Sequence, residues 1–259
     1  MPSTISIEGH LAKLYALWLR EFKVFLRERS RLVAATFTPV LWLFVIGSGL
    51  NSVNPSTPPG LDYQQFIFPG IVSMSIIFTS VFYGSYIIWD RKFDFLKSVM
   101  VAPVSRATVF VGKTLGGMTN SLIQAAILLA IGVIIGIPFT PYSLAAAVAI
   151  VLLMSFGLTS LGLALGSYMY SLEGFQMIVS FVAFPLFFLS GALFPLGSLP
   201  GWLSLLTAAD PVAYGVDALR NLMLGTGTYG VEFDLAVLAA YVAALGAFGV
   251  YSFNRMKAV

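Results

Sequence analysis

The length of its charge-free apolar runs is the feature that most constrains this sequence. Between Tyr63 and Trp89 there is no Asp, Glu, Lys or Arg, and between Ala107 and Leu172 the only such residue is Lys113. Only 10% of the 259 residues are charged, whereas soluble domains average about 25%. Each run is long enough to cross about 30 Å of hydrocarbon as a helix. The sequence therefore predicts an all-helical integral membrane protein.

Glycine, proline and short polar stretches divide the chain into six predicted spans within one transmembrane domain, residues 1–259. In the fourth span, Gly162 and Gly166 form a small-x-x-x-small pair, a spacing typical of closely packed membrane helices. The predicted spans are residues 32–50, 66–89, 107–136, 143–168, 175–193 and 235–253.

Residues 10–29, which precede the first span, predict an amphipathic helix. Leu14, Trp18 and other apolar residues recur at helical spacing, while Lys13, Arg20 and Arg27 fall seven apart on the opposite side. A helix with a basic face of this kind is expected to lie in the interface of an anionic leaflet.

The distribution of lysine and arginine predicts the orientation of the chain. Of the 14 such residues, six lie in residues 1–31, five in residues 90–113 and two in residues 254–259, and the alternate loops hold only Arg220. Because cytoplasmic loops carry the excess of positive charge, both termini and the loop after the second span are expected to be cytoplasmic.

That loop, Asp90–Arg106, is a charged segment between two apolar runs. Phe93, Phe95 and Leu96 alternate with charged residues as in a short amphipathic helix, and Pro103 ends the pattern. The residues alone allow two interpretations. The segment is either a turn that lies on lipid headgroups or a docking helix that transmits force from a soluble partner.

Residues 195–234, on the opposite side, are interrupted by glycine or proline every few positions. Backbone that leaves helical geometry at membrane depth has to be buried in protein or line a wet cavity, so we expect short re-entrant or interfacial helices here. Asp217 and Arg220 are three apart on a predicted short helix, a spacing that predicts a surface ion pair. Together with Asp210 they are candidates for bracing an external gate.

Signals of enzymatic chemistry are weak. Gly112-Lys113-Thr114 resembles the end of a phosphate-binding loop, but it lies inside an apolar predicted helix and not between a strand and a helix. We expect Lys113 instead to extend to the inner headgroups. One histidine, His10, and no cysteine leave no histidine triad or multi-histidine metal site within one chain. We therefore expect no catalytic, cofactor or metal site here.

The predicted spans also contain no Asp or Glu, although ion-coupled carriers usually need ionisable groups inside the membrane. Energy is therefore expected to come from outside the membrane. Side chains of spans two, three and five are candidates for a substrate path, although packing between helices explains them equally well. These candidates are Phe78, Phe82, Tyr86, Asn120, Gln124, Phe184, Phe187 and Phe188.

Three groups of motifs, in order along the chain, resemble one family. They are Phe68-Pro-Gly; Asp90-Arg with Ala102-Pro-Val-Ser-Arg106; and the run from Phe194-Pro through Leu199-Pro-Gly-Trp202 and Asp210-Pro to Asp217-Ala-Leu-Arg220. The chain is similar to the membrane subunit of type-2 ABC exporters, which include drug-resistance, nodulation-factor and polysaccharide export permeases. One departure is Asp210, where many relatives have Asn before the proline.

The resemblance implies a permease of the prokaryotic inner membrane that moves an amphiphilic substrate (drug, lipid, glycolipid or polysaccharide) outward. A second copy, or a related half, would pair with it in the bilayer, and two ATP-binding cassette subunits would bind the ATP and Mg²⁺. No nucleic-acid partner is expected. The residues implied as the coupling helix are Asp90, Arg91, Lys92, Phe93, Asp94, Phe95, Leu96, Pro103 and Arg106. An ATP-independent secondary transporter or channel is the alternative.

Overall fold

In a computed structural model of the chain, which describes residues 7–51, 60–96, 101 and 104–256, the regular structure of these residues is helical, without strands. Six helical segments are long and apolar enough to cross a membrane. They agree with the six predicted spans to within four residues at each end, and they are Leu32–Leu50, Tyr63–Lys92, Arg106–Ile134, Pro141–Tyr168, Leu172–Leu189 and Val231–Arg255.

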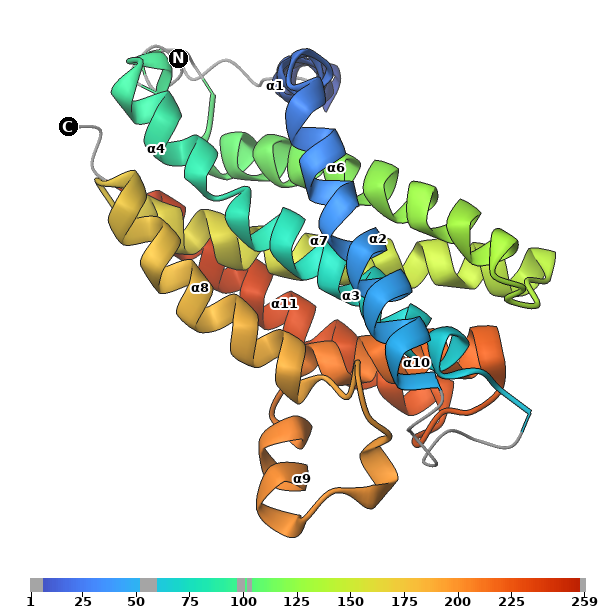
Figure 1. The fold of residues 1–259 in the computed structure, drawn as a ribbon. Coiled ribbons are helices and arrows are strands. Elements are labelled where there is room, and N and C mark those ends of the chain that lie inside the picture. The colour runs from blue at the N-terminus through green and yellow to red at the C-terminus, as the bar shows by residue number, and fades with distance from the viewer. Residues whose placement is uncertain (1–6, 52–59, 97–100, 102–103, 257–259) are drawn as a thin grey trace.

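The spans surround α3 (Tyr63–Phe82), which packs against α2 (Arg29–Asn51), α6 (Arg106–Ile134), α7 (Pro141–Tyr168) and α8 (Leu172–Leu189). The last span, α11 (Val231–Arg255), packs mainly on α7 (Figure 1). Several spans extend further than predicted, so that Asp90, Glu173 and Asp234 fall within their ends. The prediction that no span contains an acidic residue is therefore wrong.

The second span is broken between α3 and α4 (Ser85–Lys92), at Tyr83 and Gly84. The backbones of this break and of α7 are in close contact there. A Cβ atom on Gly84 would lie 1.9 Å from the carbonyl oxygen of Gly162, and one on Gly166 would lie 2.4 Å from the carbonyl oxygen of Gly84. The predicted packing role of Gly162 and Gly166 is therefore confirmed, and it fixes the direction in which α4 leaves the bundle.

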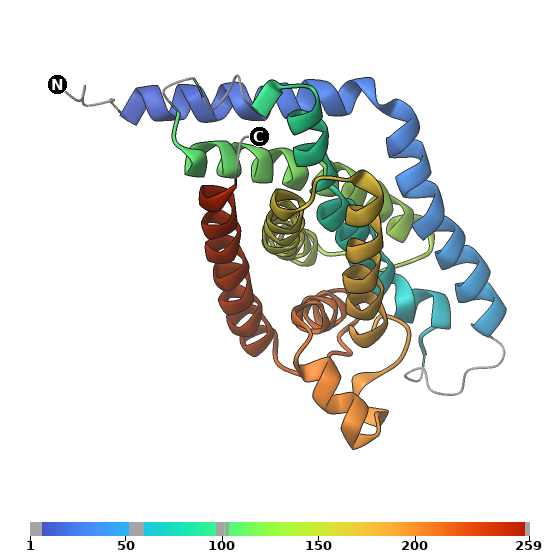
Figure 2. The ribbon, with the colours of Figure 1, turned by 90° about the vertical axis from the view of Figure 1, so that its left-hand side faces the viewer.

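The helix α1 (Ile7–Arg27) lies across one end of the bundle, along the first half of α6 (Figure 2). Leu17 of α1 packs where a Cβ on Gly112 would stand, and Trp18 donates a 2.9 Å hydrogen bond to the Thr119 hydroxyl. Leu11 and Tyr15 are about 60% exposed. This end, which also holds α4 and the last turn of α11, is called the basic end below.

The opposite end, called the α9 end, carries three short helices, η1 (Leu196–Ser198), α9 (Gly201–Ala208) and α10 (Pro211–Leu224). The expected short helices are therefore present. However, α10 is packed into the bundle, and Asp217 and Arg220 are 0% and 1% exposed. The predicted surface ion pair is wrong, because both side chains have internal partners.

Candidate functional site

The segment predicted to dock a partner starts at the basic end, where α4 stops. Asp90, Arg91 and Lys92 form the last turn of α4, and Phe93 and Asp94 make a turn. Asp94 has a φ of 56°, in the left-handed region that Asp tolerates better than most residues. Residues 97–100 and Pro103 lie outside the described residues, and with them the second half of the predicted amphipathic helix.

The described residues at the end of α4 present a small aromatic surface to solvent. Lys92 and Asp94 are exposed, and Phe93 is 72% exposed. The Phe93 ring stacks on Trp89 with 5.7 Å between centroids, and the Lys92 ammonium lies 5.4 Å from the Trp89 ring. An exposed aromatic pair flanked by charges of both signs has the chemistry of a protein contact. We call Trp89, Lys92, Phe93 and Asp94 the exposed platform.

Two other predicted docking residues, Arg91 and Arg106, bind the ends of neighbouring helices. The Arg91 guanidinium donates hydrogen bonds of 2.6 Å to the Met169 carbonyl and 3.0 Å to the Ser167 carbonyl, at the end of α7. Arg106 donates to the carbonyls of Asn254 and Met256, at the end of α11. The last carbonyls of a helix lack intrahelical donors and carry partial negative charge. Both arginines therefore cap helices.

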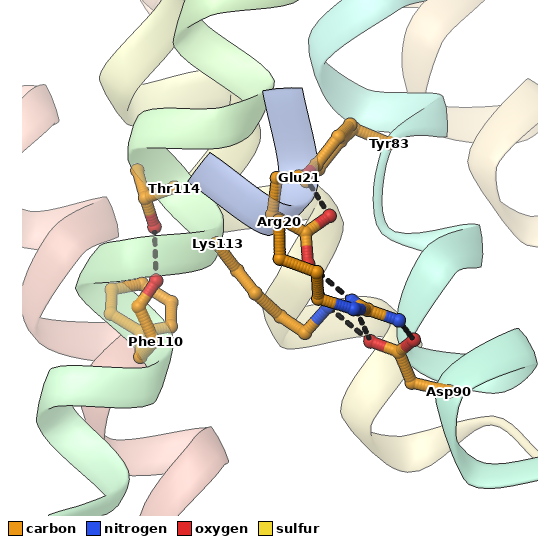
Figure 3. A network of polar contacts seen from close by, with 7 residues as sticks. All are labelled: Arg20, Glu21, Tyr83, Asp90, Phe110, Lys113 and Thr114. Carbon is orange, nitrogen blue, oxygen red and sulfur yellow. Dashed lines mark hydrogen bonds and ion pairs between the residues drawn. The ribbon is translucent and has the colours of Figure 1, made fainter. Parts of the chain in front are cut away.

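A cluster of charged side chains lies directly behind the platform (Figure 3). Lys113, from α6, is 1% exposed, and its ammonium lies 3.1 Å from the Glu21 carboxylate of α1 and also pairs with Asp90. Arg20 forms ion pairs of 2.6 Å with both Asp90 and Glu21. The prediction that Lys113 extends to the headgroups is therefore wrong. Its charge is neutralised inside the protein.

Hydrogen bonds complete the cluster. The Tyr83 hydroxyl, at the break between α3 and α4, donates 2.6 Å to Glu21, and Tyr86 donates 2.6 Å to Glu28 at the end of α1. Burial by itself raises the pKa of Glu21, but Lys113, Tyr83 and Arg20 together bring that pKa below its ordinary value. Glu21 is therefore ionised at neutral pH, and two carboxylates face two cations.

The cluster connects α1 to the docking segment. Besides its two ion pairs, the Arg20 guanidinium lies 3.5 Å from the centroid of the Phe95 ring, at the start of the helix that follows the exposed platform. Leu96, the next residue, is 1% exposed. The docking segment is therefore linked to α1 through the contacts of Asp90 and Phe95 with Arg20, and to α6 through the ion pair of Asp90 with Lys113.

A second feature is an apolar cavity of about 550 Å³ between α2 and α8, with α3 and α6 behind it. Five of the predicted substrate-path residues line it: Phe78, Phe82, Asn120, Gln124 and Phe184. The other three do not. Tyr86 belongs to the charge cluster, Phe187 is buried against Trp42, and Phe188 stacks on Phe184 beside the cavity.

The predicted gate residues lie together at the α9 end but do not contact one another as predicted. Arg220 donates a 2.8 Å hydrogen bond to the Gly191 carbonyl and lies 4.2 Å from the Phe66 ring. Asp217 accepts from the backbone of Thr228 at 2.9 Å and of Tyr229 at 2.7 Å. Burial lowers the pKa of Arg220 to about 10, against the opposing effect of Asp217.

Asp210 caps α10 by accepting a 2.9 Å hydrogen bond from the Val212 amide. Its other carboxylate oxygen is buried without a partner among the described residues. Burial raises the pKa of Asp210 to about 8, although the Val212 hydrogen bond opposes the rise. Among the residues described, no group of three or more His, Asp or Glu side chains could hold a metal ion.

Comparison with known proteins agrees with this architecture. The sequence profile of the family described as ABC-2 type transporter matches residues 12–224. The chain is 28% identical over 224 residues to the ycf38 transport permease of Cyanophora paradoxa, covering 85% of this chain and 77% of that one. It is 27% identical to the inner membrane transport permease YadH of Escherichia coli K12 (89% and 90%) and 25% identical to nodulation protein J of Rhizobium meliloti (87% of each chain).

The family profile covers the charge cluster, the platform, the cavity and all of α10. Permeases of this family lack the ATPase, which is carried by a partner subunit. The chain therefore belongs to the ABC-2 type transporter family, of which it is a membrane permease.

Proposed function

We propose that this permease works in an exporter, in which a separate ATP-binding subunit docks on the exposed platform and drives an amphiphilic substrate outward. ATP and Mg²⁺ are held by that partner. The observation that carries the docking proposal is the position of the platform. Phe93 is exposed on one side of Asp90, while Asp90 itself is tied to Arg20 and Lys113. A partner that presses on Phe93 displaces both α1 and α6.

The membrane orientation in this proposal follows from the charges. The basic end holds the lysine- and arginine-rich segments and faces the cytoplasm, where ATP is available. The E. coli relative YadH is an inner membrane transport permease, and we assign the same location here. In this orientation α1 lies in the inner interface and exposes Leu11 and Tyr15 to lipid.

A second copy of the permease completes the transporter in this proposal. Large apolar side chains of α2 and α8 are exposed, among them Phe37 at 62%, Met177 at 68% and Phe181 at 78%. Two such faces, one from each copy, would enclose a path beside the cavity. Phe78, Phe82 and Phe184 line that cavity, which suits a substrate with an apolar part. A related half that presents the same faces would serve equally.

The proposal is tested by purifying the permease from its native membranes in mild detergent and measuring vanadate-sensitive ATP hydrolysis. We expect an ATP-binding subunit to co-purify with the natural chain and to hydrolyse ATP. The Phe93→Ser preparation should lose most of this ATPase activity. Tyr142→Ser is the matched control, because Tyr142 is 76% exposed at the start of α7, far from the platform. Full ATPase activity in Phe93→Ser would place docking elsewhere. A natural chain that transports without nucleotide would overturn the proposal in favour of a secondary carrier or channel.

A further inference from the structure

The cavity has a lining that restricts what it can hold. Fourteen residues surround it, and none of them is charged or a histidine. Apolar and aromatic side chains of four elements form the wall, including Trp42 of α2, Met74 of α3 and Phe184 of α8. Its volume of about 550 Å³ is within the range of about 300–1,000 Å³ that small-molecule sites occupy.

Most polar residues of the lining are at the back of the cavity, on α3 and α6, and the other is Thr38 of α2. Gln124 donates to the Ala35 carbonyl and accepts from the Thr79 hydroxyl, so its amide is already used. Asn120, one helical turn away, is 7% exposed, and no hydrogen bond of its side chain occurs among the described residues. The Ser75 hydroxyl is 1% exposed and also has no partner in this part of the chain.

Two buried polar groups without partners, both facing one cavity, indicate a ligand. A buried donor or acceptor that finds no hydrogen bond costs free energy, so such groups are rare in folded proteins. Ser75 is on α3 four residues before Thr79, and Asn120 is on α6 four residues before Gln124. Because Thr79 and Gln124 are in contact and the two helices are antiparallel, the free groups lie on opposite sides of that contact.

The absence of charge in the lining excludes ionised groups from the cavity. A carboxylate, phosphate or ammonium inside it would be desolvated without a counter-charge, at a high cost. Two cations of the neighbouring helices α1 and α6, Arg20 and Lys113, are already paired with Glu21 and Asp90. An ion could therefore not recruit them without breaking the charge cluster.

We infer that the cavity binds the uncharged part of an amphiphile, a hydrocarbon chain whose hydroxyl or amide groups hydrogen-bond to Asn120 on one side of the Thr79–Gln124 contact and to Ser75 on the other. Any ionised head of the same molecule stays outside the cavity, beyond Phe25 and Leu32 or in the lipid. The inference rests on the proposed function only in taking this ligand as the class of the transported substrate. It disfavours polysaccharide, which has no apolar segment to fill such walls.

Trp42 allows a direct binding test, because it lines the cavity. In a full-length chain with the other three tryptophans replaced by Phe, quenching of Trp42 is measured in nanodiscs with brominated amphiphiles. The probes are 9,10-dibromostearamide, which is neutral, and 9,10-dibromostearyl-trimethylammonium, which is charged. A Phe248→Trp chain without other tryptophans reports access from bulk lipid, because Phe248 is 43% exposed on α11, outside the proposed pairing faces.

We expect the neutral probe to quench Trp42 at about a tenfold lower mole fraction than the charged one, relative to the Phe248→Trp reference. The probe has one amide, which can reach only one of the two groups. One of the substitutions Asn120→Leu and Ser75→Ala should therefore weaken the binding of the neutral probe by about two- to tenfold, the effect of losing one hydrogen bond. Ser73→Ala is the matched control, because Ser73 is on the same helix, is fully buried and bonds the Pro69 carbonyl. It should bind like the natural chain.

Equal quenching by both probes, or quenching that Asn120→Leu and Ser75→Ala leave unchanged, would show ordinary lipid contact and overturn the inference. Neither the partner nor ATP is present in this assay. A failure here therefore leaves platform docking intact, and loss of docking in the ATPase assay leaves the binding site intact.

Discussion

The Lys113 ammonium lies 3.1 Å from the Glu21 carboxylate, although the two residues are 92 positions apart in the chain. Both side chains are buried, and Lys113 is shared with Asp90. Breaking a buried ion pair by removing one partner leaves an uncompensated charge, which costs about 3–5 kcal/mol. We therefore expect Lys113→Met to be strongly destabilised in thermal unfolding of the detergent-solubilised permease.

The control for this prediction is Lys23→Met, since Lys23 is exposed on the same helix as Glu21. It should unfold like the natural chain. Combining Lys113→Met with Glu21→Gln should cost less than the sum of the two single changes, because the pair is then removed together. Additive effects would mean that the two residues do not interact.

The spans could be predicted from the sequence, because twenty or so consecutive apolar residues leave few alternatives to a membrane helix. The charge cluster could not. Glu21 lies on an amphipathic pattern in which it looks like a solvent-facing residue, and nothing in the local sequence shows that α1 folds back along α6. Lys113 was the one indication in the sequence, because it is a single cation in a long run without other charges. A cation in such a position is expected to pair with a buried acidic group.

The sequence also could not predict which residues of the docking segment are exposed and which bind inside the protein. Arg91 and Lys92 are adjacent and carry the same charge, yet Arg91 reaches carbonyls 76 and 78 residues away. At the α9 end, Asp217 and Arg220 have the spacing of an ion pair, but loop residues Thr228 and Tyr229 are better placed donors for Asp217. In both places the contacts of the side chain depend on residues distant in sequence and not on local spacing.

Arg91 and Lys92 should therefore respond differently to the same substitution. Charged hydrogen bonds contribute about 1.5–3 kcal/mol, so Arg91→Ala should lower the unfolding temperature by releasing the end of α7. Lys92→Ala, on the exposed platform, should leave the unfolding temperature unchanged and weaken the recovery of the ATP-binding subunit. The same pull-down and unfolding assays compare both variants. If Arg91→Ala is as stable as Lys92→Ala, the capping role of Arg91 is wrong.

Asp210 predicts a pH dependence of stability. Its pKa is about 8 in the folded protein, against an ordinary value of 3.8 that applies after unfolding. Between about pH 4 and pH 8 the folded state therefore holds a proton that the unfolded state has released, so stability falls as pH rises through this window. The slope from one such group is at most about 1.4 kcal/mol per pH unit.

Asp210→Asn should remove this slope, because an asparagine oxygen still accepts from the Val212 amide and does not titrate. Unfolding temperatures at pH 5 and pH 8.5 measure the effect. We expect the variant to exceed the natural chain by much more at pH 8.5 than at pH 5, because most of the window lies between these two pH values. If the unfolding temperatures of the natural chain and of Asp210→Asn change equally with pH, the raised pKa of Asp210 is wrong.

The contact between the α3–α4 break and α7 predicts the effect of one methyl group. A Cβ at Gly84 would lie 1.9 Å from the Gly162 carbonyl oxygen, which is backbone and cannot rotate away. Overpacking of this kind costs about 1–3 kcal/mol or more. Gly84→Ala should therefore unfold at a lower temperature than the natural chain. Because α4 is displaced, the variant should also bind the ATP-binding subunit less well. Gly49→Ala is the control, because nothing lies within 4 Å of its added Cβ and alanine favours the helix by about 0.5–1 kcal/mol. Equal stability of the two variants would show that the helices can separate at Gly84 without cost.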